Sequence, residues 1–179
     1  MALSLLRRLL AGQYSDHAVL DWPVIDAPAP EVNVAENRFG RLKFGAPLDD
    51  AHYLGKPESC RRIGRDYLEL VYARAGFQVD FDHGLLAYGA FFVGPDEAQP
   101  ATEGLTYCFP ALEGGPRFTP QTSRADLEKV FGPPDQVDAM DADDVIVTFR
   151  KGDLVLEFEM NLAGGLKRWN IYPEKQTSR

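Results

Sequence analysis

The chain has 179 residues, of which 45% are hydrophobic and 26% charged, a balance typical of a soluble globular protein and not of a disordered one. Its formal net charge of −8 argues against nucleic-acid binding, because contact with phosphates requires an excess of Lys and Arg. No apolar run approaches the roughly 20 residues that span a bilayer. The acidic balance is compatible with a basic protein partner.

Residues 1–37 form the first region of the predicted organisation. Leucines recur on one helical face of Met1–Gly12, which predicts a short amphipathic helix packed on the body of the protein. Arg7 and Arg8 interrupt the apolar core that a signal peptide requires, so we expect a cytoplasmic protein. Residues 13–37 contain three prolines and little periodicity, which indicates an extended connector.

Residues 38–95 predict a first α+β unit. A short strand over Arg38–Phe44 precedes a helix over Pro47–Leu54, which ends at Gly55. Alternating apolar residues then predict a hairpin of two half-buried strands, with Leu68, Leu70 and Tyr72 on the first and Phe77, Val79 and Phe81 on the second. A further apolar run, residues 85–93, predicts the third strand of this unit.

Residues 118–173 predict a second unit of the same kind. Ser123 is placed to cap a helix that ends at Gly132. Two alternating strands follow, with Val145, Val147 and Phe149 on one and Leu154, Leu156 and Phe158 on the other, and residues 166–172 supply a third. Residues 96–117, rich in Pro and Gly, are the predicted linker, and residues 174–179 the tail.

The two units keep one register without gaps. Gly132 lies 77 residues after Gly55, and the same spacing relates the apolar and acidic positions of both hairpins from Gly55 to Asp82. A slip of one residue would invert every strand face, so chance agreement is improbable. The sequence therefore predicts an α+β fold of two tandem units, each a helix and an antiparallel three-stranded meander, with the helices packed on the sheets.

A short motif recurs at the end of each predicted helix. Residues 54–58 read Leu-Gly-Lys-Pro-Glu and residues 131–135 read Phe-Gly-Pro-Pro-Asp, each followed by its hairpin. This pattern resembles the β-lactamase-inhibitor-like unit, which also occurs in small bacterial outer-membrane assembly lipoproteins. The resemblance implies a protein-binding surface in place of an active site. The chain departs from that family in lacking a signal peptide, a lipidated cysteine and an evident disulfide pattern.

No set of residues in the sequence predicts catalysis, a cofactor or a metal. Asp80, Asp82 and His83 place two carboxylates beside an imidazole, but the three histidines of the chain lack the close spacing of zinc sites, and His83 fits a turn. Cys60 follows no C-x-x-C pattern and stands next to two arginines without a recognisable base, so a structural role is favoured. The acidic run from Asp138 to Asp144 lacks the Gly and Glu of a calcium loop.

The predicted binding residues are the acids that recur in both units, together with nearby aromatics. Asp80 and Asp82 on one strand and Glu157 and Glu159 on its counterpart point away from the predicted core. With Trp169 and Tyr172 they would form an exposed surface suited to a basic protein partner. In the alternative interpretation, cross-strand pairs neutralise these acids, with Arg150, Lys167 and Arg168 as the partners.

We therefore predict a non-enzymatic protein-binding module, of the inhibitor or immunity type, that occludes a protein partner. Two other functions remain open. One is a small-ligand-binding protein or enzyme that uses a cleft between the repeats, with Asp80, Asp82 and His83 as candidates. The other is a structural or assembly module whose N-terminal helix docks elsewhere.

Overall fold

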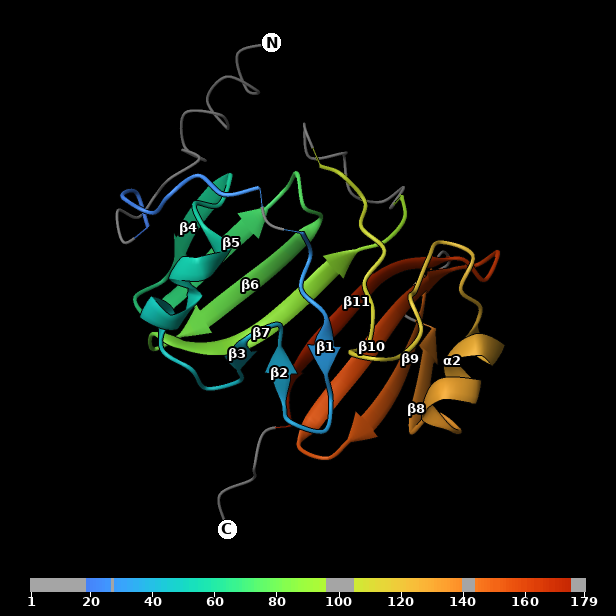
Figure 1. Cartoon of the computed structure of the whole chain (residues 1–179). Coiled ribbons are helices and arrows are strands. Elements are labelled where there is room, and N and C mark those ends of the chain that lie inside the picture. Colours follow the sequence, from blue (N-terminus) through green and yellow to red (C-terminus); the bar gives the residue numbers. More distant parts are fainter. Residues whose placement is uncertain (1–18, 27, 96–104, 140–143, 175–179) are drawn as a thin grey trace.

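The computed structural model describes residues 19–26, 28–95, 105–139 and 144–174, and this part of the chain is mostly β (Figure 1). Its elements, in chain order, are β1 (Val32–Asn33), β2 (Arg38–Phe39), β3 (Leu42–Lys43), the 3₁₀ helix η1 (Leu48–Leu54), β4 (Ser59–Ile63), β5 (Tyr67–Tyr72), β6 (Phe77–Asp82), β7 (Leu85–Phe92), α2 (Arg124–Phe131), β8 (Gln136–Ala139), β9 (Asp144–Lys151), β10 (Leu154–Asn161) and β11 (Leu166–Pro173). The predicted N-terminal helix over Met1–Gly12 lies outside the described residues.

One antiparallel sheet of eight strands dominates the molecule, in the order β4-β5-β6-β7-β11-β10-β9-β8. The two repeats meet at its centre, where β7 pairs with β11 from Phe92 opposite Arg168 to Gly89 opposite Ile171. The spacing of 77 residues recurs in the structure, because β5 begins at Tyr67 and β9 at Asp144. The repeats are thus two halves of one sheet, continuous through this pairing.

The predicted α+β class is wrong. Each repeat contributes four strands to the sheet, and its helix is a single short element of 7 residues in η1 and 8 residues in α2. The missed strands are β4 and β8, which form the two edges of the sheet. An edge strand that buries few side chains carries no strong apolar alternation, and all four residues of β8 are exposed.

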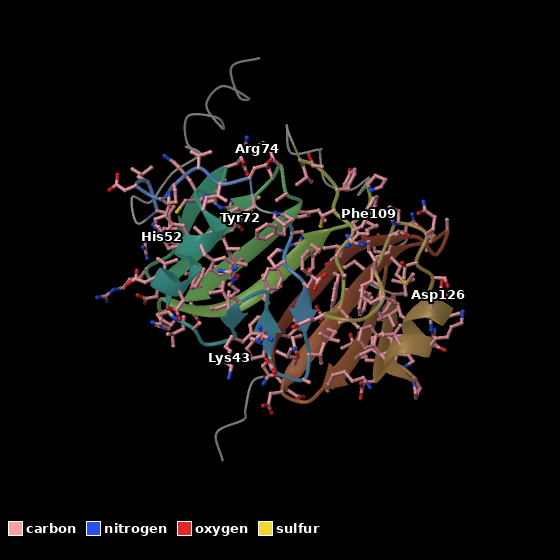
Figure 2. All side chains as sticks on the ribbon, viewed as in Figure 1. Lys43, His52, Tyr72, Arg74, Phe109 and Asp126 are labelled. Carbon is pink, nitrogen blue, oxygen red and sulfur yellow. The ribbon has the colours of Figure 1, made fainter. Side chains whose placement is uncertain are left out.

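The hydrophobic core lies on one face of the eight-stranded sheet. The alternating residues of the two hairpins, such as Leu70, Val79, Val147 and Leu156, are fully buried there. The three-stranded sheet β1–β3 and the helices η1 and α2 lie over this face (Figure 1). Tyr72 belongs to the same core, stacked on a Phe at 4.5 Å between ring centroids (Figure 2).

The small sheet β1–β3 packs closely on the centre of the large one. The Phe39 ring stacks on Phe91 with 4.8 Å between centroids. A Cβ atom at Gly89 would lie 2.6 Å from the Phe39 ring, so this approach requires a residue without a side chain. Phe39 is consequently fully buried.

The helices end alike but begin differently. Gly55 and Gly132 follow them with φ of +75° and +79°, a conformation that favours glycine. At the start of α2, Ser123 and Asp126 form the reciprocal hydrogen bonds of a capping box. Pro47 precedes η1 and provides no side-chain cap. Within the described ranges, neither helix has the length and apolar character needed to cross a membrane.

Candidate functional site

The strand side chains that point away from the core form a second surface of the eight-stranded sheet, called here the open face. The buried residues of β1–β3, η1 and α2 all belong to the core cluster on the other side. In the described part of the chain, no helix or strand therefore remains to cover the open face.

Five of the six predicted binding residues lie on the open face, and one does not. Asp80 and Asp82 extend from β6, Glu157 and Glu159 from β10, and Tyr172 from β11. Trp169 is fully buried in the core, with its ring stacked on that of Phe158 at 5.3 Å between centroids and a Phe118 ring at 5.0 Å. Trp169 therefore has no surface to offer a partner.

Tyrosine hydroxyls bind the recurring carboxylates on each half of the open face. On the first half, Tyr67 Oη donates to Asp80 Oδ2 at 2.6 Å, and Gln78 Nε2 donates to Asp80 Oδ1 at 2.9 Å. On the second half, Tyr172 Oη donates to Glu157 Oε1 at 2.6 Å. Such charge-assisted bonds fix the rings as well as the carboxylates.

A third group of polar residues crosses the junction between the repeats. Tyr88 Oη on β7 donates to Asn170 Oδ1 on β11 at 2.6 Å, and Asn170 Nδ2 donates to Glu159 Oε1 at 2.5 Å. Arg168 donates to the Tyr88 hydroxyl at 3.0 Å, and its guanidinium lies 5.1 Å from the Phe92 ring centroid. The Tyr88 and Tyr172 rings stack at 6.4 Å, and Tyr88 lies opposite Asp80 in the pairing of β6 with β7, so the three groups form one connected surface.

Asp80 differs from the predicted solvent-exposed acid. It faces away from the core as expected, but only 3% of its surface is exposed, because it lies beneath the longer side chains around it. Burial raises the pKa of this carboxyl to about 6, although hydrogen bonds from Tyr67 and Gln78 lower it in part. Burial likewise raises the pKa of the Tyr67, Tyr88 and Tyr172 hydroxyls, which remain protonated donors.

The basic residues considered as neutralising partners make other contacts. Arg150 pairs with Glu174 at 3.1 Å, and Lys167 pairs with Asp144 at 2.6 Å. Glu157 and Glu159 instead accept the bonds from Tyr172 and Asn170, and both are half-buried. Asp80, Glu157 and Glu159 are therefore part of an ordered polar network, whereas the Asp82 side chain is exposed.

A hollow of about 330 Å³ opens on the second half of the open face. The polar or charged residues around it come from β8, β9, β10, β11 and the segment after β11. They are Gln136, Asp138, Thr148, Arg150, Glu157, Tyr172 and Glu174, with Val155 as the apolar residue. The hollow thus places two of the predicted binding residues, Glu157 and Tyr172, in one concave part of the surface.

The structure gives no support to a metal or thiol site. His83 occupies the turn after β6 with φ of +50°, and its side chain is largely exposed. No group of three His, Cys, Asp or Glu residues in the described segments is arranged to hold a metal. Cys60 is a buried core residue, and burial raises the pKa of the Cys108 thiol to about 12, so neither is an activated nucleophile.

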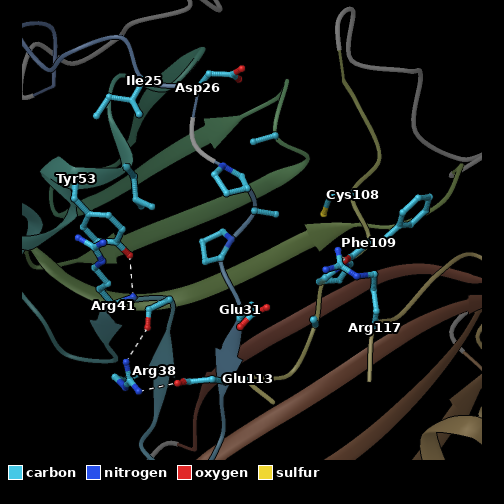
Figure 3. Close-up of a pocket in the computed structure, with 18 of the residues that line it drawn as sticks. Ile25, Asp26, Glu31, Arg38, Arg41, Tyr53, Cys108, Phe109, Glu113 and Arg117 are labelled. Atoms are coloured by element: carbon cyan, nitrogen blue, oxygen red, sulfur yellow. Dashed lines mark hydrogen bonds and ion pairs between the residues drawn. The ribbon is translucent and has the colours of Figure 1, made fainter. Parts of the chain in front are cut away.

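A larger cavity lies elsewhere, on the side of the sheet that bears η1 and β1–β3 (Figure 3). Its volume is about 1040 Å³, and the extended connector before β1 and residues 108–117 form much of its wall. The sequence does not predict this cavity. Irregular segments carry no periodicity, and only the tertiary structure brings the connector next to residues 108–117. The sequence shows only that the chain near the cavity contains arginines, at positions 38, 41, 74 and 117.

Comparisons with known proteins identify no family. No family model matches the sequence, and no curated protein sequence matches it significantly. Among solved structures, a DUF4309 family protein, YjgB of Bacillus subtilis, is similar over 74% of this chain and 82% of its own, with 16% identity and a TM-score of 0.48. The predicted resemblance to β-lactamase-inhibitor-like units remains a prediction.

Proposed function

We propose that the chain is a non-enzymatic protein-binding module that occludes a basic surface of its partner with the open face. The observation that carries the proposal is the set of tyrosines on that face, each held by a short hydrogen bond to a carboxylate or amide. No described element covers this face, so its outer side chains are accessible to a partner. An inhibitor or immunity protein would use it to cover the functional surface of a target.

The residue types on the open face are those that dominate protein interfaces. Tyr and Arg are enriched among hot-spot residues, and Tyr88, Tyr172, Arg150 and Arg168 all lie there. Because their positions are fixed by internal bonds, binding orders few additional side chains. This lowers the entropic cost of association.

The charge of the open face favours a basic partner. Seven carboxylates, those of Glu69, Asp80, Asp82, Asp138, Asp144, Glu157 and Glu159, stand on its strands, against four basic groups, those of Arg61, Arg150, Lys167 and Arg168. Complementary charge accelerates association and selects among partners. The two free cysteines suit the reducing cytoplasm, where the proposal places the protein.

The test is affinity capture from lysate of the source cells at low and at high salt. We expect one basic protein to be retained at low salt by the wild type and to be lost, by at least tenfold, with Tyr172→Ala and with Tyr88→Ala. Lys129→Ala is the matched control, because Lys129 lies on α2, is largely exposed and belongs to the opposite side of the molecule.

Two results would contradict the proposal. One is the absence of any retained protein at either salt concentration. The other is equal retention by the wild type and both tyrosine variants, since a partner held in that way contacts another surface.

A further inference from the structure

We propose that the large cavity beside the connector binds an organic anion, a carboxylate or sulfonate attached to an apolar body. The cavity is distinct from the open face, because Tyr53, Leu54 and Gly40 in its wall belong to the elements on the other side of the sheet. Its volume of about 1040 Å³ exceeds that of a single bound water or ion by far and is in the range of small-molecule sites.

The cavity wall is rich in arginine, although the protein as a whole is acidic. Four arginines line it, at positions 38, 41, 74 and 117, against three acids at positions 26, 31 and 113. The chain as a whole carries a formal charge of −8. The capacity of the wall for an anion therefore depends on which of these arginines a carboxylate already pairs with.

Two of these arginines are already neutralised. Arg38 contacts Glu36 at 2.7 Å and Glu113 at 3.1 Å. Arg74 contacts Glu58 at 2.6 Å. They contribute to the shape of the wall more than to its capacity for an added anion.

The other two arginines make no ion pair with any described residue. The Arg41 guanidinium lies over the Tyr53 ring, 5.2 Å from its centroid. Arg117 donates through Nη1 to the carbonyl oxygen of Phe109 at 2.8 Å, which leaves its remaining donors for a ligand (Figure 3). A guanidinium presents a planar set of donors that matches a carboxylate or sulfonate.

Aromatic and aliphatic side chains line the same cavity as these guanidiniums. Tyr53 is fixed in place because its hydroxyl accepts the backbone N–H of Arg41 at 3.0 Å. Phe109 is 48% exposed and Ile25 40% exposed, so both present apolar surface in the cavity wall. An apolar body attached to the anionic group would cover these side chains.

The experiment is a fluorescence titration with anilinonaphthalene sulfonate, an organic anion with an aromatic body. The wild type is expected to bind it saturably. The double variant Arg41→Gln/Arg117→Gln is expected to bind it at least tenfold more weakly. Lys43→Gln on β3 is the control, because it removes one exposed positive charge outside the cavity and is expected to leave binding unchanged.

Two further arms separate charge from apolar contact. N-phenylnaphthylamine has the same rings without the sulfonate and is expected to bind the wild type at least tenfold more weakly. Octanoate is expected to displace the bound sulfonate from the wild type. This arm needs no variant and therefore holds even where a substitution disturbs folding.

The proposal is overturned by any of four results: no saturable binding, equal binding by the double variant, equal binding of the neutral probe, or no displacement by octanoate. Tyr172→Ala is expected to bind the sulfonate as the wild type does. Its effect on capture of a protein partner therefore reports on the open face independently of the cavity.

Discussion

The acids of the open face are held by neighbouring side chains, and Asp80 shows this most clearly. Its carboxylate lies almost wholly out of contact with solvent, with Tyr67 and Gln78 donating to its two oxygens. Those bonds compensate only part of the loss of hydration, because burial still dominates and raises the pKa to about 6. Ionisation of Asp80 in the folded protein therefore has a cost in the free energy of unfolding.

That cost predicts a pH-dependent effect of Asp80→Asn. A raised pKa in the folded state means that Asp80 contributes stability fully below its ordinary pKa of 3.8 and loses it as the pH rises through about 6. Relative to the variant, the wild type should lose roughly 3 kcal/mol of unfolding free energy over this range. Urea denaturation at a series of pH values measures the difference.

The decisive quantity is the slope of this difference against pH. The substitution also alters hydrogen bonds, but that contribution to the free energy of unfolding does not depend on pH. Asp82→Asn is the control, since Asp82 lies on the same strand with an exposed side chain. A difference between the wild type and Asp80→Asn that stays constant from pH 4 to pH 7 would show that Asp80 is not destabilised by burial.

Among the elements, the two helices show how the repeats have diverged. The capping box of Ser123 and Asp126 satisfies N–H groups at the start of α2, whereas η1 has no side-chain cap and is a 3₁₀ helix. Ser123→Ala should lower the free energy of unfolding by about 1 kcal/mol, measured by chemical denaturation. An unchanged midpoint would mean that the tertiary contacts of α2 alone determine its start.

The contact between the small and the large sheet depends on a single glycine. Because a Cβ at Gly89 would meet the Phe39 ring at 2.6 Å, Gly89→Ala should destabilise the protein by about 1–3 kcal/mol. The smaller side chain in Phe39→Leu should restore part of that loss in the double variant. Purely additive effects in a double-mutant cycle would show that the two residues are not in close contact.

The sequence predicts the interior of each repeat well and its edges poorly. Leu68, Leu70, Phe77, Val79 and Phe81 are buried as their alternation indicates, because half-buried strands impose a period of two. The strands β4 and β8 escaped prediction because edges bury little. The α+β class was wrong for the same reason. The two short helices have clear start and stop signals in the sequence, whereas the edge strands have none, so the prediction contained too few strands.

The candidate site was predicted in part. The direction of Asp80, Asp82, Glu157 and Glu159 follows from strand periodicity, and the structure agrees with it. Trp169 and Tyr172 were assigned to one face, but they lie three residues apart on β11, and strand alternation places them on opposite faces. No sequence pattern reports the burial of Asp80 under its neighbours.

At the scale of the whole molecule, the pairing of β7 with β11 turns two repeats into one surface. Tyr88 and Asn170, one from each repeat, bond across that junction and connect the two acidic halves. All described covering elements lie on the opposite side, so the molecule has one face built for its own core and one available to a partner. We therefore propose the open face as the binding surface.

Site-specific photocrosslinking in living cells tests that claim most directly. Benzoylphenylalanine would replace Arg150, exposed on the open face, or Lys129, exposed on α2. We predict a discrete adduct with one basic protein from position 150 and none from position 129. An adduct from position 129 alone, or equal adducts from both positions, would contradict the assignment of the open face.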